Sequence, residues 1–374
     1  MTNIVIIGAG IIGTTTAYQL AKQGAHVTII DRQDDGQATH AAAGIICPWL
    51  AQRRNKAWYH LAKNGARIYP KLIDELKEDG EVNTGYERVG AIRLNTIDKR
   101  LQAAHERVLK RKKDAPEIGE ITLLDEEETK KMFPLLKDNT YRSIHISGAA
   151  RVDGQALRQA LLSGAIKYGA TYIEGDAQLI YKDDIVTGAK VNGKTFEADL
   201  VIATTGAWMS ELLSLIGIDI DVKPQKAQII HLHLSESTHS WPVIMPPNNQ
   251  YILPFDQNRI VIGATHESKA GFDTRVTAGG VHEILTKALE VAPGLHDSTI
   301  ENIKVGFRPF TPESKPIIGP LPHIKGILIA NGLGASGLTT GPYIGIQLAK
   351  IALEQTYDID LSLYNVAQAI PEEL

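Results

Sequence analysis

The stretch "VIIGAGIIGTTTAYQLAKQGAHVTIID", Val5 to Asp31, lies almost at the start of the chain and decides the fold. A short run of apolar, mostly β-branched residues before Gly8 indicates a buried strand. Apolar residues then recur at helical spacing from Ile12 until Gly24, and the run from Val27 to Ile30 restores a strand. This order predicts a βαβ unit, in which a helix connects two parallel strands.

Three glycines in the turn of this unit, Gly8, Gly10 and Gly13, form the pattern G-x-G-x-x-G, which binds dinucleotides in such a context. Gly8 permits the tight turn, Gly10 lets the helix N-terminus approach a pyrophosphate, and Gly13 lets helix and strand pack closely. Asp31 ends the second strand, where a carboxylate accepts hydrogen bonds from a ribose diol and repels a 2′-phosphate. The unit therefore predicts NAD or FAD rather than NADP, and it does not decide between the first two.

The composition is that of an ordinary globular protein with a small-molecule ligand. The chain has 374 residues and a formal net charge of −4, which argues against nucleic-acid binding because phosphates require a basic surface. Cys47 is the only cysteine, which excludes an intrachain disulfide and fits a reducing compartment, so we expect a cytoplasmic protein. The sequence shows no leader pattern and no apolar run near the ~20 residues of a membrane span. Peripheral membrane association stays open.

Three later segments favour FAD over NAD. The first, "QATHAAAGIICPW" (Gln37 to Trp49), is rich in small residues, which suits a backbone that lies against a flat ring system or a tightly packed core helix. The second, "ADLVIATTGAW" (Ala198 to Trp208), indicates a strand that ends at Gly206, on the edge where open α/β sheets bind ligands.

The third segment, "GILIANGLGASGLTTGPYIGIQLAKI" (Gly326 to Ile351), carries the most chemistry. It predicts a strand, a glycine-rich loop and a helix that begins near Pro342. The N-terminus of such a helix stabilises negative charge that grows on an isoalloxazine during its reduction. An NAD enzyme needs no such element near its C-terminus, so the placement favours FAD.

The order of these motifs resembles that of a known enzyme family. The glycine pattern, "AAAGIICP", "ATTGAW", "YILPF" with "IVIGATHE", "GFRPFTPESKPIIG" and "NGLGASGLTTGP" follow one another as in the FAD-dependent family of D-amino-acid oxidase, glycine oxidase and sarcosine oxidase. The resemblance covers essentially the whole chain and looks closest to glycine oxidase and D-amino-acid dehydrogenase. Sarcosine oxidases of this family hold flavin through a cysteine in the segment that corresponds to "PESKPIIG". This chain has no cysteine there, which implies non-covalent FAD.

The resemblance implies an α/β fold with two domains. A Rossmann-like FAD-binding domain of the glutathione-reductase-like type would comprise residues 1–88, 145–222 and 308–374. Residues 89–144 and 223–307 would form an α+β substrate-binding domain, with an antiparallel sheet over the flavin. The patterns of "QIIHLHL", "QYILPF" and "RIVIGAT" predict strands of such a sheet, and Val281 to Val291 has the period of a helix.

The motifs and the resemblance together imply a set of cofactor-binding residues. They come from the glycine-rich turn, the end of the second strand, the small-residue segment and the later loops. These residues are Gly8, Gly10, Ile11, Ile12, Gly13, Asp31, Arg32, Thr39, His40, Ala42, Ala43, Gly44, Ile45, Ala177, Thr205, Gly206, Trp208, Arg308, Gly334, Ala335, Ser336, Gly337, Leu338 and Thr339.

Three residues are candidates for the substrate side. Arg308, in "GFRPF", offers two parallel N–H donors to a carboxylate, and Pro309 restricts its backbone; an ion pair with another side chain is the alternative. By the resemblance, Tyr251 contacts the same carboxylate, and otherwise it is a core aromatic residue. His266 occupies a position that lines the pocket in glycine oxidases but is apolar in the best-known of them. It either contacts the substrate or lies at the pocket rim without a role.

The resemblance implies oxidation of a small amino acid, such as glycine, a D-amino acid or an N-methyl amino acid. Hydride transfer from the substrate to flavin N5 would give an imino acid, which hydrolyses to the oxo acid. Oxygen or another electron acceptor would reoxidise the flavin, and the sequence decides neither between oxidase and dehydrogenase nor about homo-oligomers. An NAD-dependent oxidoreductase and a non-catalytic nucleotide-binding protein remain the alternatives.

We expect no metal site. His231 and His233 lie two residues apart on one strand, as two metal ligands would, but no matching cluster of carboxylates or cysteines accompanies them.

Overall fold

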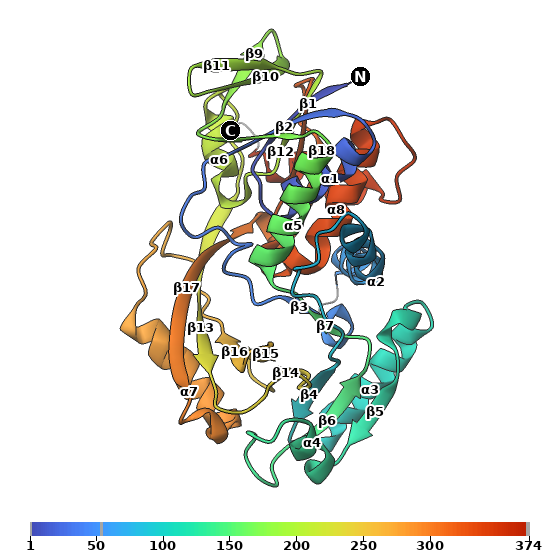
Figure 1. Cartoon of the computed structure of the whole chain (residues 1–374), viewed down its shortest axis with the longest axis vertical. Coiled ribbons are helices and arrows are strands. Elements are labelled where there is room, and N and C mark those ends of the chain that lie inside the picture. Colours follow the sequence, from blue (N-terminus) through green and yellow to red (C-terminus); the bar gives the residue numbers. More distant parts are fainter. Residues whose placement is uncertain (1, 53–54, 372–374) are drawn as a thin grey trace.

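The computed structural model describes residues 2–52 and 55–371, which form two lobes joined by several chain segments (Figure 1). Within these ranges the first lobe contains a six-stranded sheet. In spatial order its strands are β18 (Ile317–Pro320), β19 (Ile327–Asn331), β12 (Leu200–Ala203), β1 (Asn3–Ile7), β2 (His26–Asp31) and β8 (Thr171–Glu174). All neighbouring pairs are parallel except β18 with β19. We call this lobe the parallel-sheet domain.

The second lobe contains an eight-stranded, mostly antiparallel sheet, counted over the same described ranges. Its strands are, in spatial order, β17 (Thr299–Phe310), β13 (Lys223–His233), β16 (Arg259–Gly263), β15 (Tyr251–Pro254), β14 (Val243–Met245), β4 (Ala91–Asn95), β6 (Arg142–Ile146) and β5 (Ile121–Leu124). The pairing of β14 with β4 is parallel. We call this lobe the antiparallel-sheet domain.

The remaining elements are two small sheets and the helices. The small sheets are β11 (Lys194–Glu197), β10 (Ile185–Val191) and β9 (Gln178–Lys182), and the pair β3 (Ile45–Ile46) and β7 (Ala150–Arg151). The α-helices are α1 (Ile11–Lys22), α2 (Lys56–Glu78), α3 (Asp98–Lys112), α4 (Glu126–Met132), α5 (Gly154–Lys167), α6 (Met209–Ser214), α7 (Ala278–Val291) and α8 (Gly337–Ala352). The 3-10 helices are η1 (Pro48–Leu50), η2 (Pro116–Ile118), η3 (Gly206–Trp208), η4 (Pro293–Leu295), η5 (Pro312–Ser314), η6 (Gly334–Ser336), η7 (Leu361–Tyr364) and η8 (Val366–Ala369).

The βαβ unit predicted from the glycine pattern is confirmed. β1 and β2 pair in parallel, with α1 between them in the chain. Strand β1 is buried on both faces, because its side chains alternate between two cores. Ile4 and Ile6 share a core with α1, α5 and α8, whereas Val5 and Ile7 share another with α6 and the sheet of β9 to β11. This double coverage holds the carboxyl end of β1 in place beside α1.

One prediction about the C-terminal helix is wrong. Helix α8 begins at Gly337, five residues before the predicted start at Pro342, which lies inside the helix. A proline has no N–H for the carbonyl four residues earlier, here that of Leu338. The hydroxyl of Tyr69 donates to that Leu338 oxygen at 2.5 Å and so replaces the missing bond.

The antiparallel sheet turns one face toward the parallel-sheet domain. Along β15, Tyr251 and Leu253 pack with the core that includes β1, α1 and α8, while Ile252 belongs to a separate core with α7. Strand alternation thus assigns Tyr251 to the face between the domains. The strands predicted around "QIIHLHL", "QYILPF" and "RIVIGAT" are β13, β15 and β16, and the predicted helix is α7.

Strands β13 and β17 pair antiparallel along their length and form a long ribbon that reaches from one lobe into the other (Figure 1). At its upper end β17 contacts the segment after β2: the Phe307 N–H donates to the Gly36 carbonyl at 2.8 Å. A Cβ on Gly306 would lie 2.6 Å from that of Ala41, so only glycine allows this approach. Strand β17 is therefore fixed to the small-residue segment.

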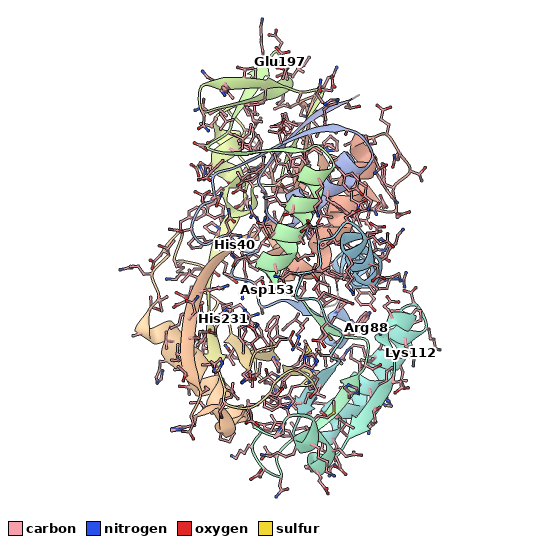
Figure 2. All side chains as sticks on the ribbon, in the orientation of Figure 1. His40, Arg88, Lys112, Asp153, Glu197 and His231 are labelled. Atoms are coloured by element: carbon pink, nitrogen blue, oxygen red, sulfur yellow. The ribbon has the colours of Figure 1, made fainter. Side chains whose placement is uncertain are left out.

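The junction of the lobes contains several charged and polar side chains. Figure 2 shows His40, Asp153 and His231 at this level, with Glu197 near the top of the view and Lys112 at the right side of the lower lobe. Over the described part of the chain, no helix has the length and apolar character to cross a membrane.

Candidate active site

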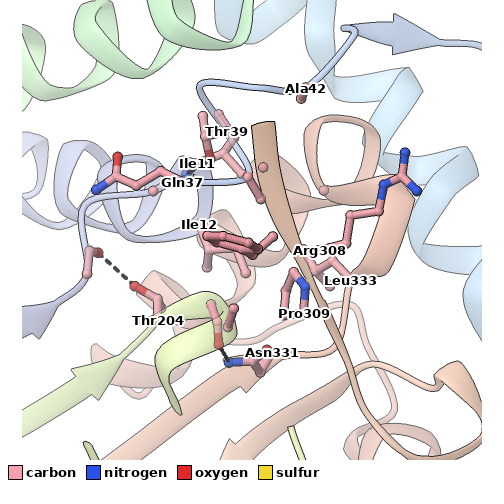
Figure 3. A pocket seen from close by; sticks show the side chains of 18 of the residues that line it. Ile11, Ile12, Gln37, Thr39, Ala42, Thr204, Arg308, Pro309, Asn331 and Leu333 are labelled. Carbon is pink, nitrogen blue, oxygen red and sulfur yellow. Dashed lines mark hydrogen bonds between the residues drawn. The ribbon is translucent and has the colours of Figure 1, made fainter. Parts of the chain in front are cut away.

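A cavity of about 530 Å³ extends between the two domains, along the carboxyl ends of β1, β2 and β12 (Figure 3). It begins at the glycine-rich turn, passes the small-residue segment and the N-terminus of α8, and ends at Tyr251, His266 and Arg308. The parallel-sheet domain supplies most of its wall, and β13, β15, β17 and the segment after β16 close it from the other domain. Its position at the carboxyl edge of the sheet is where open α/β folds bind ligands.

The glycine-rich turn has the geometry that an anion site needs. Gly8 has a φ of +98°, and a Cβ there would lie 2.7 Å from the Thr204 carbonyl oxygen. A Cβ on Gly10, by contrast, would meet only the Thr39 hydroxyl at 3.5 Å, so the space beside the start of α1 is open. The first N–H groups of a helix carry partial positive charge and attract a phosphate; in α1 the Ile11 N–H donates to the Thr39 hydroxyl at 3.1 Å.

Asp31 is buried and braces this turn. Its Oδ2 accepts from the Ala9 N–H at 2.6 Å, and its Oδ1 accepts from the Gln33 N–H and the Gln37 side chain at 2.7 and 3.0 Å. A carboxylate oxygen accepts about two hydrogen bonds, so Oδ2 keeps one position for a ribose hydroxyl. Asp31 thus shapes the turn and remains available to a ligand.

Most of the residues predicted to bind the cofactor line this one cavity. The segments around Ala42 and Ala335 face it, and the side chain of Thr339 in α8 donates to the Ile45 carbonyl at 3.0 Å, which ties the two segments together. Arg32 lines it as well, with its guanidinium paired to Asp34, Asp176 and Glu211. The predicted cofactor residues on the cavity wall are Gly8, Gly10, Ile11, Ile12, Asp31, Arg32, Thr39, Ala42, Ala43, Gly44, Ile45, Ala177, Thr205, Gly206, Trp208, Arg308, Gly334, Ala335, Ser336, Gly337, Leu338 and Thr339.

Two of the residues predicted for the cofactor site, Gly13 and His40, do not line the cavity. A Cβ on Gly13 would lie 1.9 Å from the Gly8 oxygen, so Gly13 serves the packing of α1 against the turn. The His40 ring lies near Arg158 and Lys304, and burial together with these cations lowers its pKa. The His40 carbonyl accepts from Nζ of Lys304, in β17, at 3.3 Å.

The substrate end of the cavity contains the three residues expected there. Arg308 donates from Nη1 to the Gln225 Oε1 and the Thr265 carbonyl, at 3.2 and 3.3 Å, and within residues 2–52 and 55–371 it pairs with no carboxylate. Burial lowers the pKa of Arg308, and the neighbouring Tyr251 opposes this shift. Figure 3 shows the Arg308 guanidinium on the opposite side of the view from Gln37 and Thr204.

Tyr251 and His266 share this end with Arg308. Burial raises the pKa of Tyr251 to about 12, and the Arg308 charge acts in the other direction. The pKa of His266 is lowered by burial and by Arg308, with smaller effects from Glu283 and Lys287. At neutral pH the chain therefore presents here a cationic guanidinium, a neutral phenol and a neutral imidazole. This set suits an anionic ligand group.

Several site residues were missed in the sequence. Thr204 donates from its hydroxyl to the Gly8 carbonyl at 2.8 Å, and the Asn331 amide donates to the Gly206 carbonyl at 2.8 Å (Figure 3). Both lie inside motifs quoted above, "ATTGAW" and "NGLGASG". Their positions shortly before Gly206 and Gly332 could have marked them as residues that support the cavity wall. Arg158 donates to the Ala9 carbonyl at 2.7 Å, and Asn249 lines the cavity; no local pattern marks either residue.

Comparisons with known proteins agree with this architecture. The model of the family described as FAD dependent oxidoreductase (DAO) matches residues 3–351. The chain is 56% identical to the uncharacterized oxidoreductase YurR of Bacillus subtilis (strain 168), over 99% of this chain and 100% of that one. The structure of iminodiacetate oxidase from Chelativorans sp. BNC1 is 45% identical with a TM-score of 0.94, and covers 97% of this chain and 99% of its own. Glycine oxidase from Geobacillus kaustophilus is 26% identical with a TM-score of 0.87, over 99% of both chains.

These comparisons decide between NAD and FAD, which the glycine pattern left open. The match of the family model spans nearly the whole chain, and it includes both domains and the full cavity wall. The cofactor is FAD, and the alternative of an NAD-dependent enzyme is set aside. The chain belongs to the DAO family of FAD-dependent oxidoreductases, in which glycine oxidase and iminodiacetate oxidase act on the C–N bonds of amino acids.

Proposed function

We propose that the protein oxidises the Cα–N bond of a small amino acid or N-alkyl amino acid whose carboxylate is bound by Arg308. One observation supports this most: Arg308 is a partly buried guanidinium on the cavity wall, with only neutral acceptors around it in the described residues. Buried charges are normally paired, so an anionic ligand is the missing partner. Two parallel N–H groups of arginine match the two oxygens of a carboxylate.

The residues of the cavity fit FAD. The open space at Gly10 and the N-terminus of α1 suit its pyrophosphate, and the segments around Ala42 and Ala335 suit its ring system. FAD, when bound, accepts the two electrons and the hydrogen that leave Cα. The chain offers the sixteen-residue helix α8, whose N-terminus faces the cavity, to stabilise the negative charge that results.

We propose that the FAD is held without a covalent bond. The segment Pro312–Gly319 contains no cysteine. Cys47 does line the cavity, but burial raises the pKa of its thiol to about 12. The thiolate is the reactive form of cysteine, so this side chain is a poor nucleophile at neutral pH. Because the sequence contains no second cysteine with which Cys47 could form an intrachain disulfide, we also propose a reducing compartment such as the cytoplasm.

The chain's own residues bind and orient the substrate rather than remove a proton from Cα. Arg308 and the Tyr251 hydroxyl hold the carboxylate, which fixes the direction of the Cα–H bond. Transfer of a hydride from Cα requires the free amine, so the substrate must first lose its ammonium proton. The lowered pKa of His266 keeps its imidazole neutral, which is the form that can accept this proton, whereas the phenol of Tyr251 stays protonated. Loss of hydride from Cα then gives a C=N double bond, and water converts the imine to an oxo acid and an amine or ammonia.

The relatives limit the class of substrate. Glycine is the substrate named for the Geobacillus kaustophilus structure, and iminodiacetate is named for the more similar Chelativorans structure. Both contain the group N–CH₂–COO⁻, which a carboxylate clamp beside a hydride acceptor can select. We propose this group as the reacting unit. D-Amino acids and N-methyl amino acids are the neighbouring classes to compare.

An anaerobic substrate panel tests the proposal. Purified holoenzyme is mixed without oxygen with glycine, N-methylglycine, iminodiacetate and several D-amino acids, and loss of the oxidised flavin absorbance is followed. We expect bleaching with at least one compound that contains the reacting unit. A flavin that no amine reduces would favour the non-catalytic alternative. Admission of oxygen or of an artificial acceptor afterwards distinguishes an oxidase from a dehydrogenase.

A further inference from the structure

The mouth of the cavity holds a second group of polar side chains, next to the carboxylate clamp. His266 and Asn249 line the cavity and are exposed at its opening. Lys287, on α7, donates from Nζ to the Asn249 Oδ1 at 3.1 Å and to the Glu283 carboxylate at 2.6 Å. We call Asn249, His266 and Lys287 the rim group.

The contact with Lys287 decides how Asn249 presents its amide. An ammonium has only donors, so it requires the amide oxygen of Asn249 as its partner. The amide nitrogen of Asn249, which carries two N–H donors, is therefore the end that remains for a ligand at the cavity mouth. Lys287 acts here as a positioning residue, because it orients the donor of Asn249 and adds positive charge behind it.

The rim group and Arg308 lie at the same end of the cavity. The Arg308 guanidinium and Lys287 both lie close enough to His266 to lower the pKa of its imidazole, and the carboxylate of Glu283 opposes them. His266 is thus close to two cations, one from β17 and one from α7. With a neutral imidazole, this end of the cavity carries one net positive charge from Arg308, Lys287 and Glu283.

We propose that the rim group binds a second carboxylate, on the other arm of a secondary amine whose first carboxylate is held by Arg308. The substrate class is then an iminodiacid, a compound in which one nitrogen joins two carboxylated arms. This inference rests on the proposed function for the first carboxylate. An iminodiacid with a protonated nitrogen carries one net negative charge, which complements the cavity end, whereas glycine and N-methylglycine are neutral overall.

A second carboxylate has two chemical sources, and the substrate panel distinguishes them. In iminodiacetate it is attached through nitrogen, and in D-aspartate it is attached through Cα. We propose attachment through nitrogen, because a second arm on the nitrogen leaves the reacting unit N–CH₂–COO⁻ unchanged at Arg308. Efficient oxidation of D-aspartate with no oxidation of iminodiacetate would overturn this assignment.

The direct test measures binding and does not depend on turnover. Oxydiacetate has an ether oxygen in place of the reacting nitrogen, and methoxyacetate is its counterpart with one carboxylate; neither yields an imine. Their dissociation constants are measured on the holoenzyme from the change in flavin absorbance, with calorimetry as a check. We expect wild type to bind oxydiacetate at least about tenfold more tightly, the size of one charge-assisted hydrogen bond.

Matched variants then assign the preference to the rim group. Lys287→Met and Asn249→Ala should each reduce the preference for oxydiacetate by about tenfold and leave methoxyacetate binding unchanged. Lys287→Arg should restore part of it, since arginine also donates to an amide oxygen. Lys131→Met is the control, because Lys131 forms the same type of i,i+4 ion pair, with Glu127 at 2.7 Å, on α4. Equal preference in wild type and Lys287→Met would overturn the inference.

The effect of pH gives an independent readout. A bound carboxylate favours the protonated imidazole of His266, so binding of oxydiacetate should take up a proton. Its affinity should therefore rise as the pH falls below 7, while that of methoxyacetate changes less. The charged groups that face His266 are Arg308 from β17 and Glu283 and Lys287 from α7, and the Tyr251 hydroxyl stays neutral in this range. His266→Met should remove the difference.

The outcomes separate this inference from the proposed function. If amines with one carboxylate bleach the flavin as well as iminodiacetate does, and oxydiacetate shows no preference, the function stands and the second carboxylate site fails. If no amine bleaches the flavin but oxydiacetate binds in a Lys287-dependent manner, the site stands and the proposed oxidation fails.

Discussion

Replacement of Arg308 by methionine is the perturbation that most directly tests the proposed function. In the structure this guanidinium makes two hydrogen bonds, both from Nη1 and both to neutral oxygens at 3.2 and 3.3 Å. Its other N–H donors remain for a substrate carboxylate. Because the variant removes a charge that has no carboxylate partner in the described chain, we expect the fold and FAD content to be retained.

The expected loss follows from these contacts. Removal of one partner from a desolvated, hydrogen-bonded charge pair costs about 2 to 5 kcal/mol, which is roughly 30-fold to several thousand-fold in kcat/KM. The bound carboxylate also orients the Cα–H bond, and aligned geometry is worth ~7 kcal/mol or more in intramolecular reactions. We therefore expect a loss in kcat/KM near the upper end of the range of about 2 to 5 kcal/mol. Arg308→Lys should recover only part, since an ammonium lacks the two-pronged geometry.

The assay compares N-methylglycine with dimethylamine, which is the same amine without its carboxylate, in anaerobic flavin reduction. Wild type should discriminate strongly in favour of N-methylglycine, and Arg308→Met should lose most of this discrimination. Carboxylate inhibitors should weaken in parallel. A variant that keeps the full preference for N-methylglycine would refute the reasoning, because the clamp would then lie elsewhere on the cavity wall.

Three further predictions concern the cofactor and the carboxylate. Asp31→Ala should weaken FAD binding by about 1.5 to 3 kcal/mol, measured by fluorescence titration of the apoprotein, because a charged acceptor for the ribose and for the Ala9 N–H is lost; unchanged affinity would place the ribose contact elsewhere. Tyr251→Phe should lower kcat/KM by about 1 to 3 kcal/mol, mainly through KM, and wild-type kinetics would make Tyr251 a core residue only. Acid precipitation should release all flavin into the supernatant, since the Cys47 thiol is protonated with a pKa of about 12; flavin in the washed pellet would contradict non-covalent binding.

The fold could be predicted where local sequence and backbone geometry coincide. At Gly8 and Gly13 the backbone approaches so closely that only glycine fits, so the residue type itself reports the structure. The start of α8 could not be predicted in this way, because the Tyr69 hydroxyl, far away in the sequence, replaces the hydrogen bond that Pro342 lacks. Long-range compensation of this kind leaves no local pattern.

In the candidate site, too, residues within local motifs could be predicted and residues placed by long-range contacts could not. Arg308 was predicted because its neighbours, two phenylalanines and Pro309, already indicate burial and a fixed backbone. The contact of Lys287 with Asn249 joins a helix to a loop before β15, and neither residue stands in a motif. Arg158 likewise contacts the glycine-rich turn across the fold. The domain boundaries at 88/89, 144/145, 222/223 and 307/308 stay predictions from the resemblance.

The attachment of β17 to the segment after β2 has a consequence for how such an enzyme changes during evolution. Gly306 and Phe307 rest on Ala41 and Gly36, and Arg308 follows directly in the same strand. If Arg308 binds the substrate as proposed, its position depends on the segment that binds the cofactor and not on α7 or the loop before β15. Mutations in those outer elements would then change which substrate is accepted and leave the distance from the reacting carbon to the flavin unchanged. On this proposal, selectivity and chemistry would evolve independently.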